Sequence, residues 1–180
     1  MMADPEYEVR RHVVQGEHSI SDQPGVMLTT ILGSCVAACI RDPKAGVGGM
    51  NHFLLPGEGR EGGGDIRFGV YAMEVLINAL LRAGARRERL EAKLFGGGRL
   101  VRGLSDIGEA NASFARDFLE KEGIAFLGGS LGGDCARRVQ FWPVSGVARQ
   151  SLLQREQEHV FIKEAGSPAP KQHAGELELF

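Results

Sequence analysis

Two stretches of the chain repeat apolar residues with the spacing of one helix face. In residues 69–83 these positions are Val70, Met73, Leu76, Ile77, Leu80 and Leu81, and in residues 107–122 they are Ala110, Phe114, Phe118 and Leu119. Residues three and four apart lie on the same side of an α-helix, so both stretches are predicted to be amphipathic helices. Gly84 and Gly123 follow directly, and glycine commonly ends a helix.

Shorter apolar runs, bounded by turn residues, predict strands. They cover residues 36–41, 48–55, 90–95, 124–127, 138–142 and 147–153. The first two runs are separated by Asp-Pro-Lys-Ala-Gly, which favours a tight turn, and Ser145-Gly146 favours another. The segment around Cys35 and Cys39 is ambiguous, because its small apolar residues are equally typical of the start of a helix.

The order of these elements indicates the fold class. Strands before, between and after two helices are typical of an α/β domain in which layered mixed β-sheets are covered by helices. With 180 residues, 43% of them hydrophobic, the chain has the size and apolar content of a single domain, which we expect to span residues 1–162. Residues 163–180 are rich in Ala, Pro, Gly, Gln and Glu, and we expect a flexible tail until a partner supplies structure.

The charges of the chain nearly balance, with 21 Lys and Arg against 23 Asp and Glu. This argues against nucleic acid binding, which needs a basic surface. No apolar run reaches the roughly 18 residues of a membrane span, and the start of the chain lacks the apolar core of a secretion signal. We therefore expect a cytoplasmic protein with reduced thiols and no direct membrane insertion. The cysteine spacing predicts no metal site.

Cys35 and His52 have the residue types of a nucleophile and its base. A hairpin with its turn near residues 44–45 pairs residues whose numbers sum to about 88 or 89, so His52 is expected opposite Val36 or Ala37, near Cys35 after a small bulge. Such a pair can transfer an acyl group: sulfur attacks a carbonyl, the imidazole protonates the departing amine, and water hydrolyses the thioester. From residue types alone, a core cysteine and a structural histidine are the commoner situation.

Neighbouring residues supply candidate supporting groups. The backbone N–H groups around Gly33 and Ser34 are candidates to bind the oxyanion of a tetrahedral intermediate. The side chains of Ser34 and Asn51 are candidates to contact the substrate amide, although both equally suit turn caps. Strict alternation along the strand would point Asn51 away from the face that His52 occupies.

Several blocks in a fixed order carry a more specific signal. The segment TTILGSCVAACIRDPKAGVGGMNHFLLP, followed by KLFGGG, IGEAN, LGG and RRVQFWPVSG, closely resembles the CheD family of chemoreceptor glutamine deamidases. The likeness covers roughly residues 25–153. It implies that Cys35 is the nucleophile, that His52 is its base, and that Thr29, six residues before the cysteine, belongs to the site. Thr29 would orient His52, and Thr30 is the alternative for that role.

The resemblance also implies an α/β layered fold, similar to that of cytotoxic necrotizing factor-like cysteine hydrolases. The implied activity is that of a protein-glutamine glutaminase, which converts glutamines of methyl-accepting chemotaxis receptors to glutamate and ammonia. A CheC-type phosphatase is the implied binding partner, and no cofactor is expected. Two alternatives stay open: hydrolysis of receptor glutamyl methyl esters by the same chemistry, and a regulatory module that binds receptors or the phosphatase.

Overall fold

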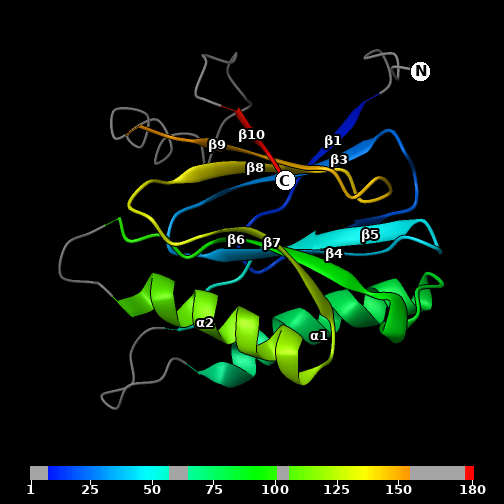
Figure 1. Cartoon of the computed structure of the whole chain (residues 1–180), viewed down its shortest axis with the longest axis horizontal. Helices are drawn as coiled ribbons and strands as arrows, with labels where there is room; N and C mark the ends of the chain where they lie inside the picture. Colours follow the sequence, from blue (N-terminus) through cyan, green and yellow to red (C-terminus); the bar gives the residue numbers. More distant parts are fainter. Residues whose placement is uncertain (1–7, 57–64, 101–105, 155–176) are drawn as a thin grey trace.

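The structure, a computed structural model, describes residues 8–56, 65–100, 106–154 and 177–180. In chain order the elements are β1 (Val9–His12), β2 (His18–Ser21), β3 (Val26–Leu32), β4 (Val36–Asp42), β5 (Val47–Asn51), α1 (Ile66–Arg82), the short 3-10 helix η2 (Arg87–Arg89), β6 (Glu91–Gly96), α2 (Asp106–Lys121), β7 (Ala125–Leu131), β8 (Arg137–Phe141), β9 (Ala148–Leu152) and β10 (Leu177–Leu179). Figure 1 shows three layers, with two sheets stacked above both α-helices. The predicted class of layered sheets covered by helices is confirmed.

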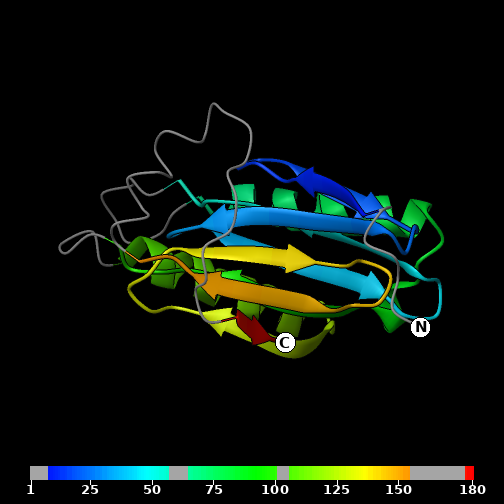
Figure 2. The ribbon, with the colours of Figure 1, turned by 90° about the horizontal axis from the view of Figure 1, so that it is seen from above.

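Both sheets have five strands in the described part of the chain. The outer sheet has the order β1-β3-β8-β9-β10, and the central sheet, which lies against the helices, has the order β2-β5-β4-β6-β7. The pair β1 and β3 and the pair β6 and β7 are parallel, whereas β4 is antiparallel to both of its neighbours. Both sheets are therefore mixed. From above, the outer sheet lies over the central sheet (Figure 2).

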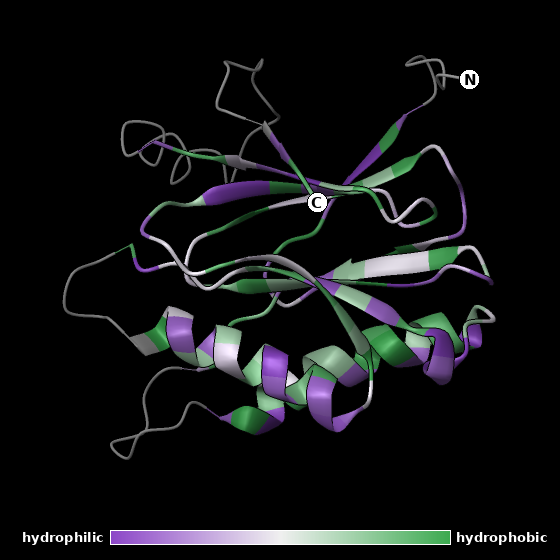
Figure 3. Ribbon diagram, in the orientation of Figure 1, coloured by the Kyte–Doolittle hydropathy of each residue, from purple (hydrophilic) through white to green (hydrophobic). Residues whose placement is uncertain are grey.

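Two apolar cores fill the spaces between the layers. The core between the two sheets includes Leu28, Leu32, Ala37, Phe95 and Phe141. The core between the central sheet and the helices includes Ile40, Met73, Leu76, Leu94 and Phe118. In Figure 3 the ribbon of α2 alternates between hydrophobic and hydrophilic colours, as expected for a helix that buries one face.

The two helices follow most of the predicted apolar spacing, but Val70 of α1 and Ala110 of α2, which were predicted on the buried faces, are exposed. Helix α1 begins earlier than predicted, at Ile66, because the side chain of Asp65 caps it by accepting the backbone N–H of Arg67 at 3.1 Å. Its buried face carries Met73, Leu76, Ile77 and Leu80. Helix α2 agrees with its predicted bounds to within one residue at each end. Neither described helix is long and apolar enough to cross a membrane.

Strands β4 and β5 form the predicted hairpin. Cys39 pairs with Met50 and Asp42 with Val47, which is the second of the two predicted registers. The ambiguous segment before the turn is therefore a strand and not a helix. Its side chains alternate between the two cores: Ala37 and Cys39 face the outer sheet, and Val36 and Ile40 face the helices.

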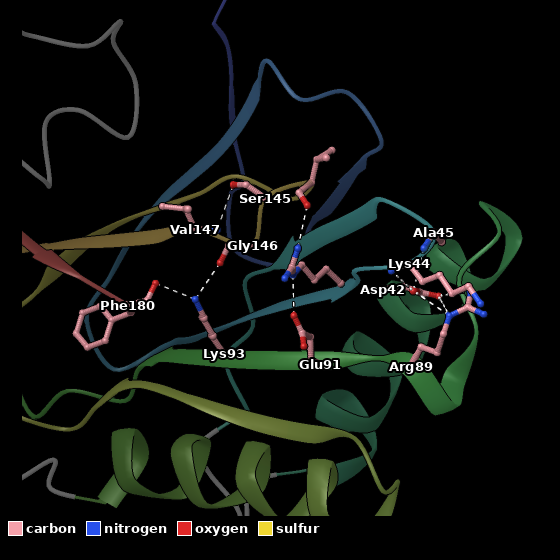
Figure 4. Close-up of polar contacts among 12 residues, drawn as sticks. Asp42, Lys44, Ala45, Arg89, Glu91, Lys93, Ser145, Gly146, Val147 and Phe180 are labelled. Carbon is pink, nitrogen blue, oxygen red and sulfur yellow. Dashed lines mark hydrogen bonds and ion pairs between the residues drawn. The ribbon is translucent and has the colours of Figure 1, made fainter. Parts of the chain in front are cut away.

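Asp42 fixes the end of β4 that is farthest from Cys35. Its carboxylate is fully buried and accepts the backbone N–H groups of Lys44 and Ala45 in the turn, at 2.9 and 3.0 Å. Arg89 completes the arrangement with an ion pair of 2.7 Å (Figure 4). These contacts, above all the one with Arg89, hold the pKa of Asp42 well below its usual range. The register of the hairpin is thus locked at its turn.

The end of the chain differs from the expectation of a tail without fixed structure. Strand β10 pairs antiparallel with β9 at the edge of the outer sheet. Phe180 packs edge-on against Phe95, with 5.5 Å between ring centroids, and its carbonyl oxygen accepts a hydrogen bond of 2.8 Å from Lys93 (Figure 4). Residues 177–180 are therefore part of the outer sheet and its core, which the amino-acid composition of the tail did not predict. The domain boundary at residue 162 lies outside the described residues and stays an expectation.

Candidate active site

Cys35 lies in the short loop between β3 and β4 and is partly exposed. The backbone of this loop is held by the glycines that end β6: the carbonyl of Cys35 accepts the N–H of Gly97 at 2.8 Å, and that of Gly33 accepts the N–H of Gly98 at 2.9 Å. A Cβ atom at Gly96, whose φ is 111°, would overlap the carbonyl oxygen of Cys35. The glycine run, which the sequence did not link to Cys35, therefore fixes the position of the thiol.

The hairpin brings His52 to the same face of the central sheet as Cys35. The backbones of Val36 and Phe53 exchange two hydrogen bonds, of 3.0 and 2.9 Å, and this pair continues the register of β4 and β5. His52 is therefore opposite Ala37, as predicted, and no bulge intervenes. Cys35 lies two positions before Ala37 and shares its face. Diagonal neighbours of this kind are about 7–8 Å apart along the backbone, within reach of a long or aromatic side chain.

The ring of His52 is nearly buried and is held at one nitrogen. Its Nδ1 atom lies 2.8 Å from Oγ1 of Thr30 and 3.3 Å from the carbonyl oxygen of Val13. The hydroxyl of Thr30 donates its own hydrogen to that carbonyl at 2.6 Å. The Oγ1 atom of Thr30 has then used its only hydrogen, and the carbonyl oxygen of Val13 has none, so both can only accept a hydrogen bond from the ring. Nδ1 therefore carries the ring hydrogen, and Nε2 keeps its lone pair. This is the tautomer that a general base needs.

Thr30, and not Thr29, makes the contact with His52. The hydroxyl of Thr29 donates to the carbonyl of Val139 within the outer sheet, at 2.9 Å. Side chains alternate along β3, and Thr30 shares the inward face with Leu28 and Leu32. The orienting contact that the resemblance implied for Thr29 is thus supplied by its neighbour, which was the alternative.

The other candidate residues lie in different positions around the pair. Asn51 points toward the helices: its side chain accepts the N–H of Ala38 at 2.9 Å and donates to the carbonyl of Ala72 at 3.3 Å. Alternation along β5 predicted this orientation, and it separates the Asn51 side chain from His52. Ser34 precedes Cys35 in the loop between β3 and β4 and, like Gly33, is half-buried.

Asn111 is a supporting residue that the sequence analysis did not single out. It is fully buried in α2, where Nδ2 donates to the carbonyl of Ser34 at 2.8 Å and Oδ1 accepts the N–H of Leu55 at 3.0 Å. One carboxamide thus joins the chain just before Cys35 to the chain just after His52. The sequence could have indicated this residue, because Asn111 is a polar residue on the same helix face as the apolar Phe114 and Phe118.

Burial sets the charge state of both reactive groups. It raises the pKa of the Cys35 thiol to about 11, an effect that the backbone N–H of the same residue partly offsets. Burial also lowers the pKa of His52. Near neutral pH the pair is therefore a thiol beside a neutral imidazole, and the proton must move from sulfur to nitrogen during the reaction.

The raised thiol pKa predicts a steep pH dependence for alkylation. Iodoacetamide should modify Cys35 slowly near pH 7, and the rate should rise about tenfold per pH unit toward pH 11, because only the thiolate reacts. Mass spectrometry of the Cys35 peptide measures this rate, and Cys39, which is buried in the core, should stay unmodified. A rate that is already maximal near pH 7 would contradict the prediction and indicate a thiolate paired with a charged His52.

Among the residues that the structure describes, no group of three or more His, Cys, Asp or Glu side chains is arranged to hold a metal ion.

Comparison with known proteins places the chain in a family. A family model described as CheD chemotactic sensory transduction matches residues 54–151, more than half of the chain. The chain is a member of the CheD family. Curated CheD relatives are similar over nearly the full length, so the comparison also extends over Cys35 and His52, which precede the segment matched by the family model.

Three of these relatives are each described as a probable chemoreceptor glutamine deamidase CheD. The protein of Caulobacter vibrioides is 55% identical, over 98% of this chain and 96% of the relative. The protein of Acidiphilium cryptum is 54% identical, over 99% of this chain and 97% of the relative. The protein of Agrobacterium fabrum is 55% identical, over 95% of this chain and 96% of the relative. A solved structure from Neisseria meningitidis, described as a member of family DUF152, is only distantly similar to this CheD-family chain, with a TM-score of 0.46 and 12% identity over 71% of this chain and 64% of that protein.

Proposed function

We propose that this CheD-family chain hydrolyses glutamine side chains of chemoreceptors to glutamate and ammonia. The observation that carries the proposal is the hydrogen bonding of His52, whose Nδ1 is held by Thr30 and Val13 while Nε2 is left to act as a base. The register of the hairpin puts His52 on the same face of the central sheet as the partly exposed Cys35. The chemoreceptor as substrate rests on the description of relatives that are about 55% identical.

The first half of the reaction forms a thioester. Nε2 of His52 takes the thiol proton as the sulfur of Cys35 attacks the carbonyl carbon of the glutamine side chain. The oxyanion that results lies next to the backbone N–H of Cys35, which already points toward the sulfur. Protonated His52 then gives its proton to the amide nitrogen, the C–N bond breaks, and ammonia leaves.

The second half regenerates the thiol. His52 removes a proton from a water molecule, which attacks the thioester carbonyl. The C–S bond breaks, the sulfur regains its proton from His52, and the side chain is released as glutamate. The balance is one water consumed and one ammonia released for each glutamine, and Thr30 keeps the ring in the same orientation through both halves.

Two further assignments belong to this proposal. The substrates are glutamines on methyl-accepting chemotaxis receptors, and a CheC-type phosphatase is a binding partner that competes for the same site. Both follow from the family resemblance.

The test is incubation of the protein with a purified cytoplasmic receptor fragment that carries the glutamines. Mass spectrometry is expected to show a gain of about one dalton per modified glutamine, with one ammonia released for each. Protein whose Cys35 has first been alkylated is the matched control and should produce neither. A methylated receptor fragment that releases methanol while the unmethylated one releases no ammonia would favour the methylesterase. Absence of both products would favour a binding module.

A further inference from the structure

A second glutamine side chain, Gln15, lies against the nucleophile. Its Oε1 atom is 3.7 Å from Sγ of Cys35, a contact in which the thiol donates. Gln15 is exposed, so the same side chain faces the solvent from which a substrate must arrive. A group in this place touches any carboxamide that comes within bonding distance of the sulfur.

The backbone holds Gln15 in a fixed relation to His52. Gly16 donates its N–H to the carbonyl of His52 at 2.8 Å, and His52 donates its own N–H to the carbonyl of Glu17 at 3.1 Å. The turn that carries Gln15, between β1 and β2, is thus tied to the base on both sides. The same turn begins at Val13, whose carbonyl contacts the ring of His52.

The side chain of Gln15 approaches the site from a different side than the two buried carboxamides, Asn51 and Asn111. Asn51 and Asn111 both use their side chains to join the sheet to the helices, at Ala72 and at Ser34 and Leu55. Gln15 reaches the sulfur from the turn beside the outer sheet. Within the described residues around the pair, it is the carboxamide on the substrate's side.

We propose that Gln15 recognises the scissile carboxamide of the substrate, an inference that rests on the proposed function. Its Nε2 donates to the substrate's carbonyl oxygen, and its Oε1 accepts a hydrogen from the substrate's amino group. A primary carboxamide offers the same acceptor and donors in the opposite order, so the two groups are complementary. The Nε2 contact strengthens as negative charge develops on the oxygen.

This pairing distinguishes glutamine from the related side chains. A methyl ester has no N–H to give to Oε1, and the glutamate product offers a carboxylate that Oε1 repels. A site built to hydrogen-bond a substrate N–H disfavours analogues that lack it, because its own acceptor is left unpaired. Gln15 therefore selects the amide over the ester and favours departure of the product.

The first test compares Gln15→Ala and Gln15→Glu with Gln23→Ala, a control in which an exposed glutamine of the turn between β2 and β3 is changed in the same way. For Gln15→Ala we expect kcat/KM on the glutamine fragment to fall by about 10²-fold, the loss typical of one oxyanion donor. The methyl-ester fragment should lose less, so the amide-to-ester ratio falls. Gln15→Glu keeps the acceptor but not the donor and should be no faster than Gln15→Ala. Gln23→Ala should match the wild type.

The second test does not depend on turnover. An aldehyde analogue of the glutamine side chain adds the Cys35 thiol across its carbonyl: a C–S bond forms, and the thiol hydrogen moves to the oxygen. Its affinity is measured by protection of Cys35 from iodoacetamide. Gln15→Ala should weaken this affinity about fivefold, the size expected for one lost hydrogen bond to the oxygen, while alkylation without the aldehyde stays at the wild-type rate.

The outcomes separate the two proposals. If the wild type deamidates receptors and Gln15→Ala matches it in both tests, the recognition role is overturned and the proposed function stands. If the wild type deamidates nothing but Gln15→Ala still weakens the aldehyde, the proposed function fails and the recognition role stands. A gain of about one dalton on Gln15 itself would make it a substrate of Cys35, which also overturns the inference.

Discussion

Removal of either the sulfur or the imidazole is expected to reduce deamidation of a receptor fragment almost to nothing. Cys35→Ala should leave only the uncatalysed rate, because no thioester can form. His52→Ala should lower kcat by about 10⁴-fold at pH 7, since a thiol whose pKa is about 11 is then ionised in only about one molecule in 10⁴. The residual rate of His52→Ala should rise about tenfold per pH unit, which the wild-type rate should not do.

The measurement is the one-dalton gain on receptor glutamines, followed over time. Cys135→Ala is the matched control for the thiol, because Cys135 is also a partly exposed cysteine and lies in the segment between β7 and β8. It should retain wild-type activity. Thermal melts of each variant separate a chemical loss from unfolding. Full activity in a folded Cys35→Ala protein would mean that the nucleophile is another residue.

The two threonines of β3, Thr29 and Thr30, form a matched pair of variants that tests which residue orients the ring of His52. Thr30→Val removes the oxygen that accepts from Nδ1 of His52 at 2.8 Å and should slow the reaction about tenfold, because the carbonyl of Val13 still accepts. Thr29→Val removes a hydrogen bond to Val139 in the outer sheet and should leave the rate unchanged. The reverse result would restore to Thr29 the role that the resemblance implied.

Loss of the carboxamide of Asn111 is expected to produce the second large effect, this time on stability. Asn111→Leu keeps a similar volume but leaves the N–H of Leu55 and the carbonyl of Ser34 without this partner. Each buried polar group that loses its hydrogen bond costs about 1–3 kcal/mol. We therefore expect the free energy of unfolding to fall by about 2–6 kcal/mol, together with a fall in activity as the two chains around Cys35 and His52 loosen.

Denaturant unfolding measures this loss as a shift of the midpoint at constant slope. Asn78→Leu makes the same chemical change on the exposed face of α1 and should alter the free energy of unfolding by no more than about 0.5 kcal/mol. A stable and active Asn111→Leu protein would show that the contacts of Asn111 do not hold the site together.

Local patterns in the sequence predicted the helices and the central hairpin well. The apolar spacing of α1 and α2 and the turn at 42–46 depend on neighbouring residues alone, so the register and the helix bounds agree with the structure, apart from the earlier start of α1 at Ile66. Strands β1 and β2 were not predicted, because each has only four residues, most of which are at least partly exposed, and they become strands by pairing with β3 and β5. Strand β10 is likewise defined by its partner β9.

The site was predictable where it depends on one hairpin and not where it depends on contacts between distant segments. Cys35 directly precedes β4 and His52 directly follows β5, so the turn between these two strands places them on one face. Asn111 and Gln15 reach them from α2 and from the turn after β1. The place of Asn111 on the apolar face of its helix indicates burial, but nothing within either segment indicates which groups the two side chains contact. Thr30 was separable from Thr29 only once the face of β3 that meets the central sheet was known.

The glycine run at the end of β6 bears on any attempt to redesign the enzyme. The loop of Cys35 is held there by main-chain hydrogen bonds, so the position of the sulfur depends on the lack of side chains at 96–98. Engineers who want to admit a bulkier or differently charged protein substrate should therefore leave residues 96–98 unchanged and begin with exposed positions such as Val14. A single methyl group added at Gly96 would be enough to move it.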